Sequence, residues 1–117
     1  HDAELHVAAT CVRLPIETGH AESVYVEIGK EDVSVEDVKE LMKNAPGVTL
    51  KDDPANQVYP MPVDAVGKSD VFVGRIRKDL NQTNGFHMWI VSDNLLKGAA
   101  WNSVQIAESL SDLNILK

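Results

Sequence analysis

Two neighbouring stretches decide the fold: Val71-Phe72-Val73-Gly74-Arg75-Ile76-Arg77 and Phe86-His87-Met88-Trp89-Ile90-Val91. In the first, Phe72, Gly74 and Ile76 alternate with the two valines and the two arginines, and this period of two predicts a strand. The second stretch is mostly apolar and predicts another strand. The link between them, residues 81–85, is rich in turn-forming residues. Such a short link favours antiparallel pairing of the two strands.

Three more strands are predicted earlier in the chain. Residues 5–14 form an apolar run that predicts a buried strand, which Pro15 ends. After Gly19 and His20, a second strand is expected because Val24, Val26 and Ile28 alternate with polar residues. Residues 48–50 predict a short strand. Residues 52–69 hold three of the five prolines and predict a long ordered loop.

Two helices complete the predicted fold. Ser34 is expected to cap the first, with Asp37 in its first turn and a stripe of Val35, Val38, Leu41 and Met42. Ser92, Asp93 and Asn94 are candidate caps of the last helix, at about residues 94–111, whose stripe is Leu96, Ala100, Val104, Ala107 and Leu110. This order predicts an α+β domain with a mixed, largely antiparallel sheet and helices packed on one face.

Composition narrows the function classes. A chain of 117 residues fits one domain. The net charge of −7 argues against nucleic acid as the main partner, and no apolar run is long enough to span a membrane. The single cysteine fits a reducing cytoplasm. Because residue 1 is a histidine rather than methionine, we expect a piece of a longer protein.

The segment from residue 10 to residue 20 contains the strongest candidates for binding and catalytic side chains. Arg13 lies in an apolar run, so its guanidinium is expected either in an ion pair with an acidic residue or as a clamp on an anionic substrate. His20 can transfer protons near neutral pH, although most loop histidines have no such role. Cys11 is predicted to be an inert core residue. The other histidines have no partner at helical spacing, so no metal site is predicted.

Two further clusters are notable. Arg75, Arg77 and Lys78 form the basic cluster, which suggests a solvated strand edge, ion pairs across an interface or, less strongly, a phosphate site. Residues 92–100 join a strand to a helix through Gly98 and two alanines. Such small residues allow tight helix packing or the close approach of a flat ligand.

These motifs together resemble the C-terminal part of the aspartate-β-semialdehyde dehydrogenase family. The segments that resemble it, in the family's order, are 9–15 with Gly19-His20, Tyr59-Pro60-Met61-Pro62, 71–77, and 92–95 through Gly98-Ala99-Ala100. Members of that family reduce L-aspartyl-4-phosphate with NADPH to L-aspartate-4-semialdehyde and phosphate, using a cysteine nucleophile. The resemblance covers nearly the whole chain.

The resemblance implies roles for four residues. His20 would be the general acid/base, Arg13 would hold the substrate α-carboxylate, Asn94 would contact the nicotinamide carboxamide of NADP, and Gly98 would lie beside that cofactor. Residues 1–117 would form the C-terminal part of the substrate-binding and dimerisation domain of a homodimer. The last helix would pack towards an N-terminal Rossmann domain and would expose its apolar face in the isolated piece.

The chain also departs from the family pattern. It contains neither the glycine-rich phosphate loop nor the Asn-Cys nucleophile segment, so we expect the isolated chain to be inactive. Two alternatives remain open. One is a fragment of an N-acetyl-γ-glutamyl-phosphate reductase, and the other is a non-catalytic dimerisation module.

Overall fold

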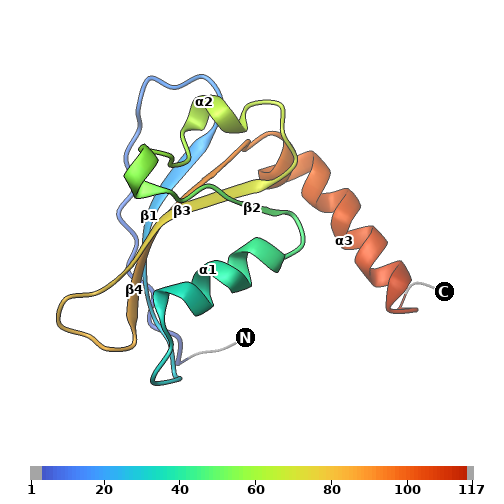
Figure 1. Cartoon of the computed structure of the whole chain (residues 1–117). Helices are drawn as coiled ribbons and strands as arrows, with labels where there is room; N and C mark the ends of the chain where they lie inside the picture. Colours follow the sequence, from blue (N-terminus) through green and yellow to red (C-terminus); the bar gives the residue numbers. More distant parts are fainter. Residues whose placement is uncertain (1–3, 116–117) are drawn as a thin grey trace.

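A four-stranded sheet forms the centre of the computed structural model, which describes residues 4–115 (Figure 1). The strands lie in the order β1-β4-β3-β2. Their bounds are His20–Glu27 for β1, Val48–Leu50 for β2, Val71–Lys78 for β3 and Gly85–Ser92 for β4. β4 is antiparallel to both its neighbours, whereas β2 is parallel to β3. The predicted α+β class and mixed, largely antiparallel sheet are confirmed.

Helix α1, Val35–Asn44, packs on one face of this sheet. The predicted cap is present: the Ser34 hydroxyl accepts a hydrogen bond from the Asp37 amide at 3.0 Å, and the Asp37 carboxylate accepts one from the Ser34 amide at 2.9 Å. Val38 joins the main core, whose other buried members are Val73, Ile76, Phe86 and Met88. The predicted apolar stripe of α1 is wrong at Leu41, which is 66% exposed. Leu41 lies at the border of the helix face that packs on the sheet, which is formed by Val35, Val38 and Met42.

The opposite face of the sheet has a smaller core. It contains Ala65, Phe72 and Val91, with Trp89 packed against them. Adjacent residues of a strand point to opposite faces, so Phe72 lies on this side and Val73 on the α1 side. Ala65 belongs to the short helix α2, Pro62–Ala65, which follows a turn of 3₁₀ helix, η1, at Pro54–Asn56. The predicted ordered loop therefore contains two short helices.

Residues 4–19 are irregular and exposed for most of their length, which corrects the prediction of a buried strand at residues 5–14. Leu5, Val7, Val12 and Leu14 are all exposed. β1 lies at the sheet edge, and this segment does not pair with it. Apolar composition alone does not form a strand, because backbone groups need a partner ladder. His1, with which the sequence begins, lies outside the described residues.

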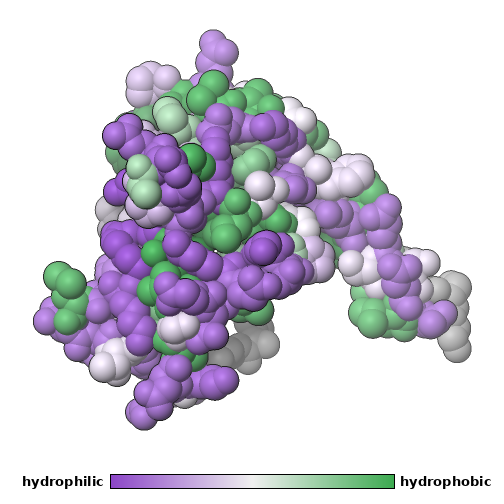
Figure 2. Space-filling model, in the orientation of Figure 1, coloured by the Kyte–Doolittle hydropathy of each residue, from purple (hydrophilic) through white to green (hydrophobic). Residues whose placement is uncertain are grey.

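The last helix, α3, Trp101–Asp112, projects away from the sheet (Figure 1). It is preceded by a π-helical turn, η2, at Leu96–Ala100. No residue of α3 is buried, and Figure 2 shows apolar side chains near its free end, where Leu113 and Ile115 are exposed. The apolar face is thus exposed, while the partner proposed for it stays a prediction. Within residues 4–115, no helix has the length and apolar character needed to cross a bilayer.

Candidate functional site

His20 is the first residue of β1 and is exposed. It pairs with Ser92 at the end of β4, because the two strands run antiparallel. The residue before it, Gly19, has a φ of 106°, which a side chain would make costly. This turn directs the chain into β1 at the edge of the sheet, so His20 lies next to the segment that follows β4.

A hydrogen bond joins that segment to the turn. The Asn94 side-chain oxygen accepts it from the Gly19 amide at 2.8 Å, and the contact is partly buried. The two residues are 75 positions apart in the sequence, so only the fold brings them together. Two of the predicted site residues, His20 and Asn94, therefore lie at the same end of the sheet.

Asp93 fixes the backbone on which Asn94 stands. Its side chain is buried, with 3% of the residue exposed. One carboxylate oxygen accepts a hydrogen bond from the Gly67 amide at 2.8 Å, and the other accepts from Leu95 and Leu96 at 2.8 and 3.1 Å. These backbone donors, Gly67 first, hold the pKa of Asp93 below its usual range. Among the three candidate caps, Asp93 is the one that caps the following turn.

Gly98 lies in the π-helical turn beside Asn94. Its amide donates to the Asp93 carbonyl at 3.2 Å, five residues back. A Cβ placed on Gly98 would be 3.7 Å from the Asn94 Cβ and would meet nothing closer. Packing within the described chain therefore does not require glycine here. π-Helical turns occur frequently at functional sites.

Arg13 does not join this group in the described chain. It is exposed in the irregular segment and forms no ion pair with any residue from 4 to 115. The interpretation of Arg13 as a partner of a described acidic residue is therefore wrong. As far as residues 4–115 are concerned, its guanidinium is open to a ligand or to another chain.

Cys11 is an exposed free thiol, which corrects its predicted place in the core. The reason is the same as for the surrounding segment: residues 5–14 form no strand and pack into no core. Among the described residues there is no group of three or more metal-ligating side chains.

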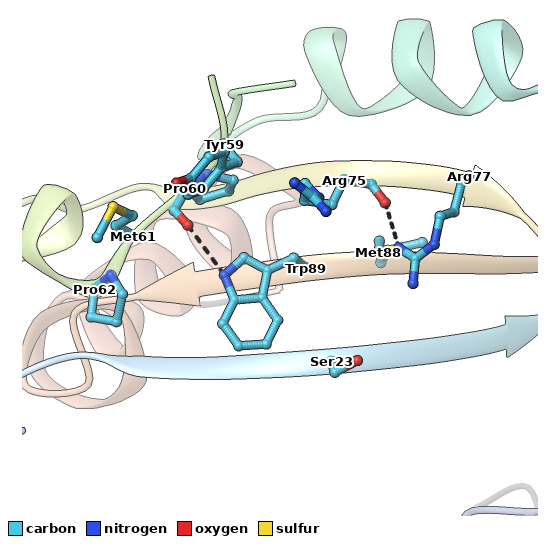
Figure 3. Close-up of a pocket in the computed structure, with 9 residues that line it drawn as sticks. All are labelled: Ser23, Tyr59, Pro60, Met61, Pro62, Arg75, Arg77, Met88 and Trp89. Atoms are coloured by element: carbon cyan, nitrogen blue, oxygen red, sulfur yellow. Dashed lines mark hydrogen bonds between the residues drawn. The ribbon is translucent and has the colours of Figure 1, made fainter. Parts of the chain in front are cut away.

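An open groove of about 470 Å³ lies between the segment from Tyr59 to Pro62 and strands β3 and β4 (Figure 3). Its wall is held by the Trp89 indole, which donates a hydrogen bond to the Pro60 carbonyl at 3.1 Å. Arg75 has a positive φ of 56° and its guanidinium lies 5.6 Å from the centre of the Tyr59 ring. The Arg77 guanidinium donates to the Arg75 carbonyl at 2.9 Å. Two members of the basic cluster predicted from sequence, Arg75 and Arg77, thus border an apolar groove.

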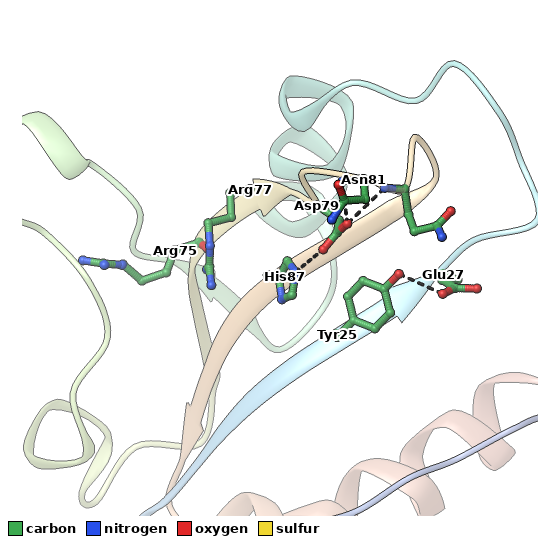
Figure 4. Close-up of polar contacts among 8 residues, drawn as sticks. Tyr25, Glu27, Arg75, Arg77, Asp79, Asn81 and His87 are labelled. Atoms are coloured by element: carbon green, nitrogen blue, oxygen red, sulfur yellow. Dashed lines mark hydrogen bonds and ion pairs between the residues drawn. The ribbon is translucent and has the colours of Figure 1, made fainter.

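A polar cluster lies at the other end of the same strands (Figure 4). His87 Nε2 is 2.8 Å from an Asp79 carboxylate oxygen, and the ring centres of His87 and Tyr25 are 4.9 Å apart. Tyr25 donates to Glu27 at 2.8 Å, and that bond is the main reason why the pKa of Tyr25 rises to about 12. No sequence motif indicated the Asp79–His87 pair, which depends on a bulge in β3.

Three comparisons with known proteins all lead to the same family. Residues 1–97 match the family described as "Semialdehyde dehydrogenase, dimerisation domain". The chain is 73% identical to the aspartate-semialdehyde dehydrogenase of Bacillus subtilis over 99% of its own length and 34% of that protein. It is 54% identical to the enzyme of that name from Aquifex aeolicus, over 94% of the chain and 32% of that protein. The chain therefore spans about a third of the length of these relatives.

The fold agrees with that of a solved structure of aspartate semialdehyde dehydrogenase II from Vibrio cholerae, complexed with ASA. The TM-score is 0.79 at 42% sequence identity, over 88% of this chain and 30% of that one.

Proposed function

Because the chain belongs to the semialdehyde dehydrogenase dimerisation-domain family, we propose that it is the C-terminal part of an aspartate-semialdehyde dehydrogenase. The observation that carries this proposal is the Gly19–Asn94 hydrogen bond, which unites two of the segments that resemble the family. The names and identities of the relatives support it, and favour it over an N-acetyl-γ-glutamyl-phosphate reductase.

The proposed reaction of the parent enzyme reduces L-aspartyl-4-phosphate to L-aspartate-4-semialdehyde and phosphate. In this proposal, Arg13 holds the substrate α-carboxylate with its two parallel donors. The His20 imidazole gives and takes a proton at the reacting centre, which typically contributes ~10²–10⁴-fold to a rate. The exposed position of both side chains is compatible with these roles.

NADP is the proposed cofactor, and its reduced form, NADPH, would supply the hydride for the reduction. The residues at the end of β4 fit its nicotinamide group. The Asn94 oxygen is already used by Gly19, so its amide NH₂ is left to donate to the carboxamide oxygen. The space beside Gly98 allows a flat ring to approach the backbone.

The parent is proposed to be a homodimer whose contact includes the groove face of the sheet. This face carries exposed apolar groups at Tyr59 and Met61, with Arg75 and Arg77 at its border. Neither arginine has an ion-pair partner among the described side chains, in a chain whose net charge is −7. A second copy supplies abundant carboxylates for them.

The nucleophile and the nucleotide-binding domain are proposed to come from the remainder of the parent, and the exposed face of α3 to pack on that domain. The isolated chain is then expected to show no turnover with L-aspartate-4-semialdehyde, NADP and phosphate, which is the reverse of the proposed reaction, although the parent turns over. We also propose a cytoplasmic location, where the single cysteine stays reduced. Turnover by the isolated chain at the parent's rate would contradict this proposal.

Two substitutions in the full-length enzyme test the assigned roles. Arg13→Leu is expected to raise KM for the substrate by ~100-fold with little change in KM for NADP, because only a carboxylate contact is lost. His20→Ala is expected to lower kcat by at least ~100-fold and to remove one limb of the pH–rate profile. Steady-state kinetics against each substrate measure both effects.

His6→Ala is the matched control, because His6 is an exposed histidine in the irregular segment that precedes β1. Arg13→Lys keeps the charge and loses the two-pronged geometry, so an intermediate KM is expected. Equal losses for substrate and NADP in Arg13→Leu would contradict the carboxylate role. An unaltered pH–rate profile in His20→Ala would exclude His20 as the acid/base.

A further inference from the structure

We propose that Asn94 is a positioning residue for His20, and that it acts through the backbone amide of Gly19. This inference rests on the proposed function, in which His20 transfers a proton. The inference gives Asn94 a second role, in addition to the proposed contact with the nicotinamide. The argument depends on how the turn before β1 is held.

The turn is held from two sides. On one side, the Asn94 oxygen accepts the Gly19 amide hydrogen at 2.8 Å. On the other, Pro62 at the start of α2 lies so close that a Cβ on Gly19 would be 3.2 Å from the Pro62 Cβ and 3.4 Å from its carbonyl oxygen. The residue between these contacts has a φ of 106°. The position of Gly19 is therefore set before the chain enters β1 at His20.

Both contacts lead back to one short segment. Pro62 belongs to α2, and Gly67, just beyond α2, donates to the buried Asp93 carboxylate at 2.8 Å. Asp93 also accepts hydrogen bonds from the Leu95 and Leu96 amides, and so holds the backbone on both sides of Asn94. The side chain of Asn94 in turn contacts Gly19. Residues 62–67 thus fix Gly19 directly through Pro62 and indirectly through Asp93 and Asn94. This arrangement fixes the backbone position of His20, although the His20 side chain is exposed.

The hydrogen bond also fixes the orientation of the Asn94 amide. Only its oxygen can accept from the Gly19 amide, so the NH₂ must point away from the turn. The Asn94 side chain therefore fixes the position of the backbone that leads into His20. It also fixes the direction of its own free NH₂ group. A shift of ~1 Å in a reacting group can cost ~100-fold in rate, so this link affects turnover.

Comparing Asn94→Leu with Asn94→Asp tests the proposal. Leucine loses the acceptor oxygen, whereas aspartate keeps an acceptor for Gly19 and loses only the NH₂ donor. In the 117-residue chain, amide hydrogen exchange followed by NMR is expected to speed up at Gly19 by ~10-fold in Asn94→Leu, the equivalent of one hydrogen bond. Exchange at Gly19 in Asn94→Asp is expected to stay near the wild-type rate.

In the full-length enzyme the two variants are expected to separate KM from kcat. Both lose the NH₂ donor and are expected to raise KM for NADP. At saturating NADP, Asn94→Leu is expected to lower kcat ~10–100-fold further than Asn94→Asp does, because only leucine also releases the Gly19 amide. Equal kcat losses in the two variants, or unchanged Gly19 exchange in Asn94→Leu, would overturn the positioning role.

Gly19→Ala disturbs the same turn through the contact with Pro62, because the added Cβ would lie 3.2 Å from the Pro62 Cβ. This variant is expected to lower kcat with little effect on KM for NADP. Gly47→Ala is its matched control, because Gly47 also has a positive φ, of 70°, but its nearest neighbour is 3.5 Å from the added Cβ. Comparable kcat losses in both variants would point to general strain and overturn the proposal. The proposed function fails separately, if His20→Ala retains full kcat while Gly19 exchange still responds to Asn94→Leu.

Discussion

Asp79 shows how much one carboxylate can hold in place. It accepts hydrogen bonds from the His87 ring at 2.8 Å and from the amides of Asn81 and Gln82 at 2.8 and 3.0 Å. The bond from His87 is the largest cause that lowers the pKa of Asp79 to about 2. These contacts close the turn between β3 and β4, where Leu80 is 97% exposed.

Replacing Asp79 with Asn is expected to lower Tm most at near-neutral pH. An unfolded Asp has a pKa of ~3.9, so the charged form stabilises the fold above that pH. The stabilisation is lost as pH falls through the folded pKa of about 2. The Tm difference between wild type and Asp79→Asn, followed by thermal melts from pH 7 to pH 2, should therefore close between about pH 4 and pH 2. Asp112→Asn, on α3, is the control, and a difference independent of pH would contradict the pairing.

At the scale of elements, the parallel pairing of β2 with β3 depends on a close backbone approach. The Lys51 amide, just past β2, donates to the Val73 carbonyl at 2.8 Å. The Lys51 carbonyl then lies directly over Gly74, and Pro60 Cδ would be 2.7 Å from a Cβ at that position. Gly74 therefore lets the chain cross the sheet surface on its way to α2.

Gly74→Ala is expected to lower the free energy of unfolding by about 1–3 kcal/mol, because the added methyl must displace backbone. Urea denaturation measures this loss. Gly29→Ala is the matched control, since a Cβ there meets nothing within 4 Å. Equal stabilities of the two variants would show that the backbone above position 74 has room for a methyl group.

At the scale of the whole molecule, two surfaces lack a partner in the described chain. One is the apolar face of α3, the helix that projects away from the sheet in Figure 1, and the other is the groove face with Arg75 and Arg77 (Figure 3). The family match covers residues 1–97, which include the groove face but not α3. We therefore assign the groove face to the proposed homodimer and α3 to contacts within the parent enzyme.

Arg77→Glu is expected to weaken self-association of the 117-residue chain by at least ~10-fold, because it places a negative charge against an acidic partner. Lys43→Glu makes the same charge change on α1, and is expected to leave association unchanged. Sedimentation equilibrium measures both dissociation constants. A monomeric wild-type chain, or equal effects of the two variants, would contradict the proposed interface.

The sequence by itself determined the elements whose signals are local. The capping box of α1 needs only Ser34 and Asp37, the alternation in residues 71–77 predicts one strand, and the apolar run 86–91 predicts another. The faces of β3 did not follow from that alternation, because the register shift after Gly74 places Phe72 and Ile76 in different cores. The sequence also contained the resemblance that assigned roles to His20, Arg13, Asn94 and Gly98. Those roles stay predictions.

Only the tertiary structure decided what depends on distant partners. The apolar residues 5–14 form no strand because no neighbouring strand receives them, and Cys11 is exposed for the same reason. The burial of Asp93 and its bond to Gly67 have no signature in sequence, since they need α2 packed beside the end of β4. The Gly19–Asn94 contact likewise spans 75 positions. Local propensity specifies elements, whereas long-range contacts place the site, because a side chain's partner is set by how the elements pack.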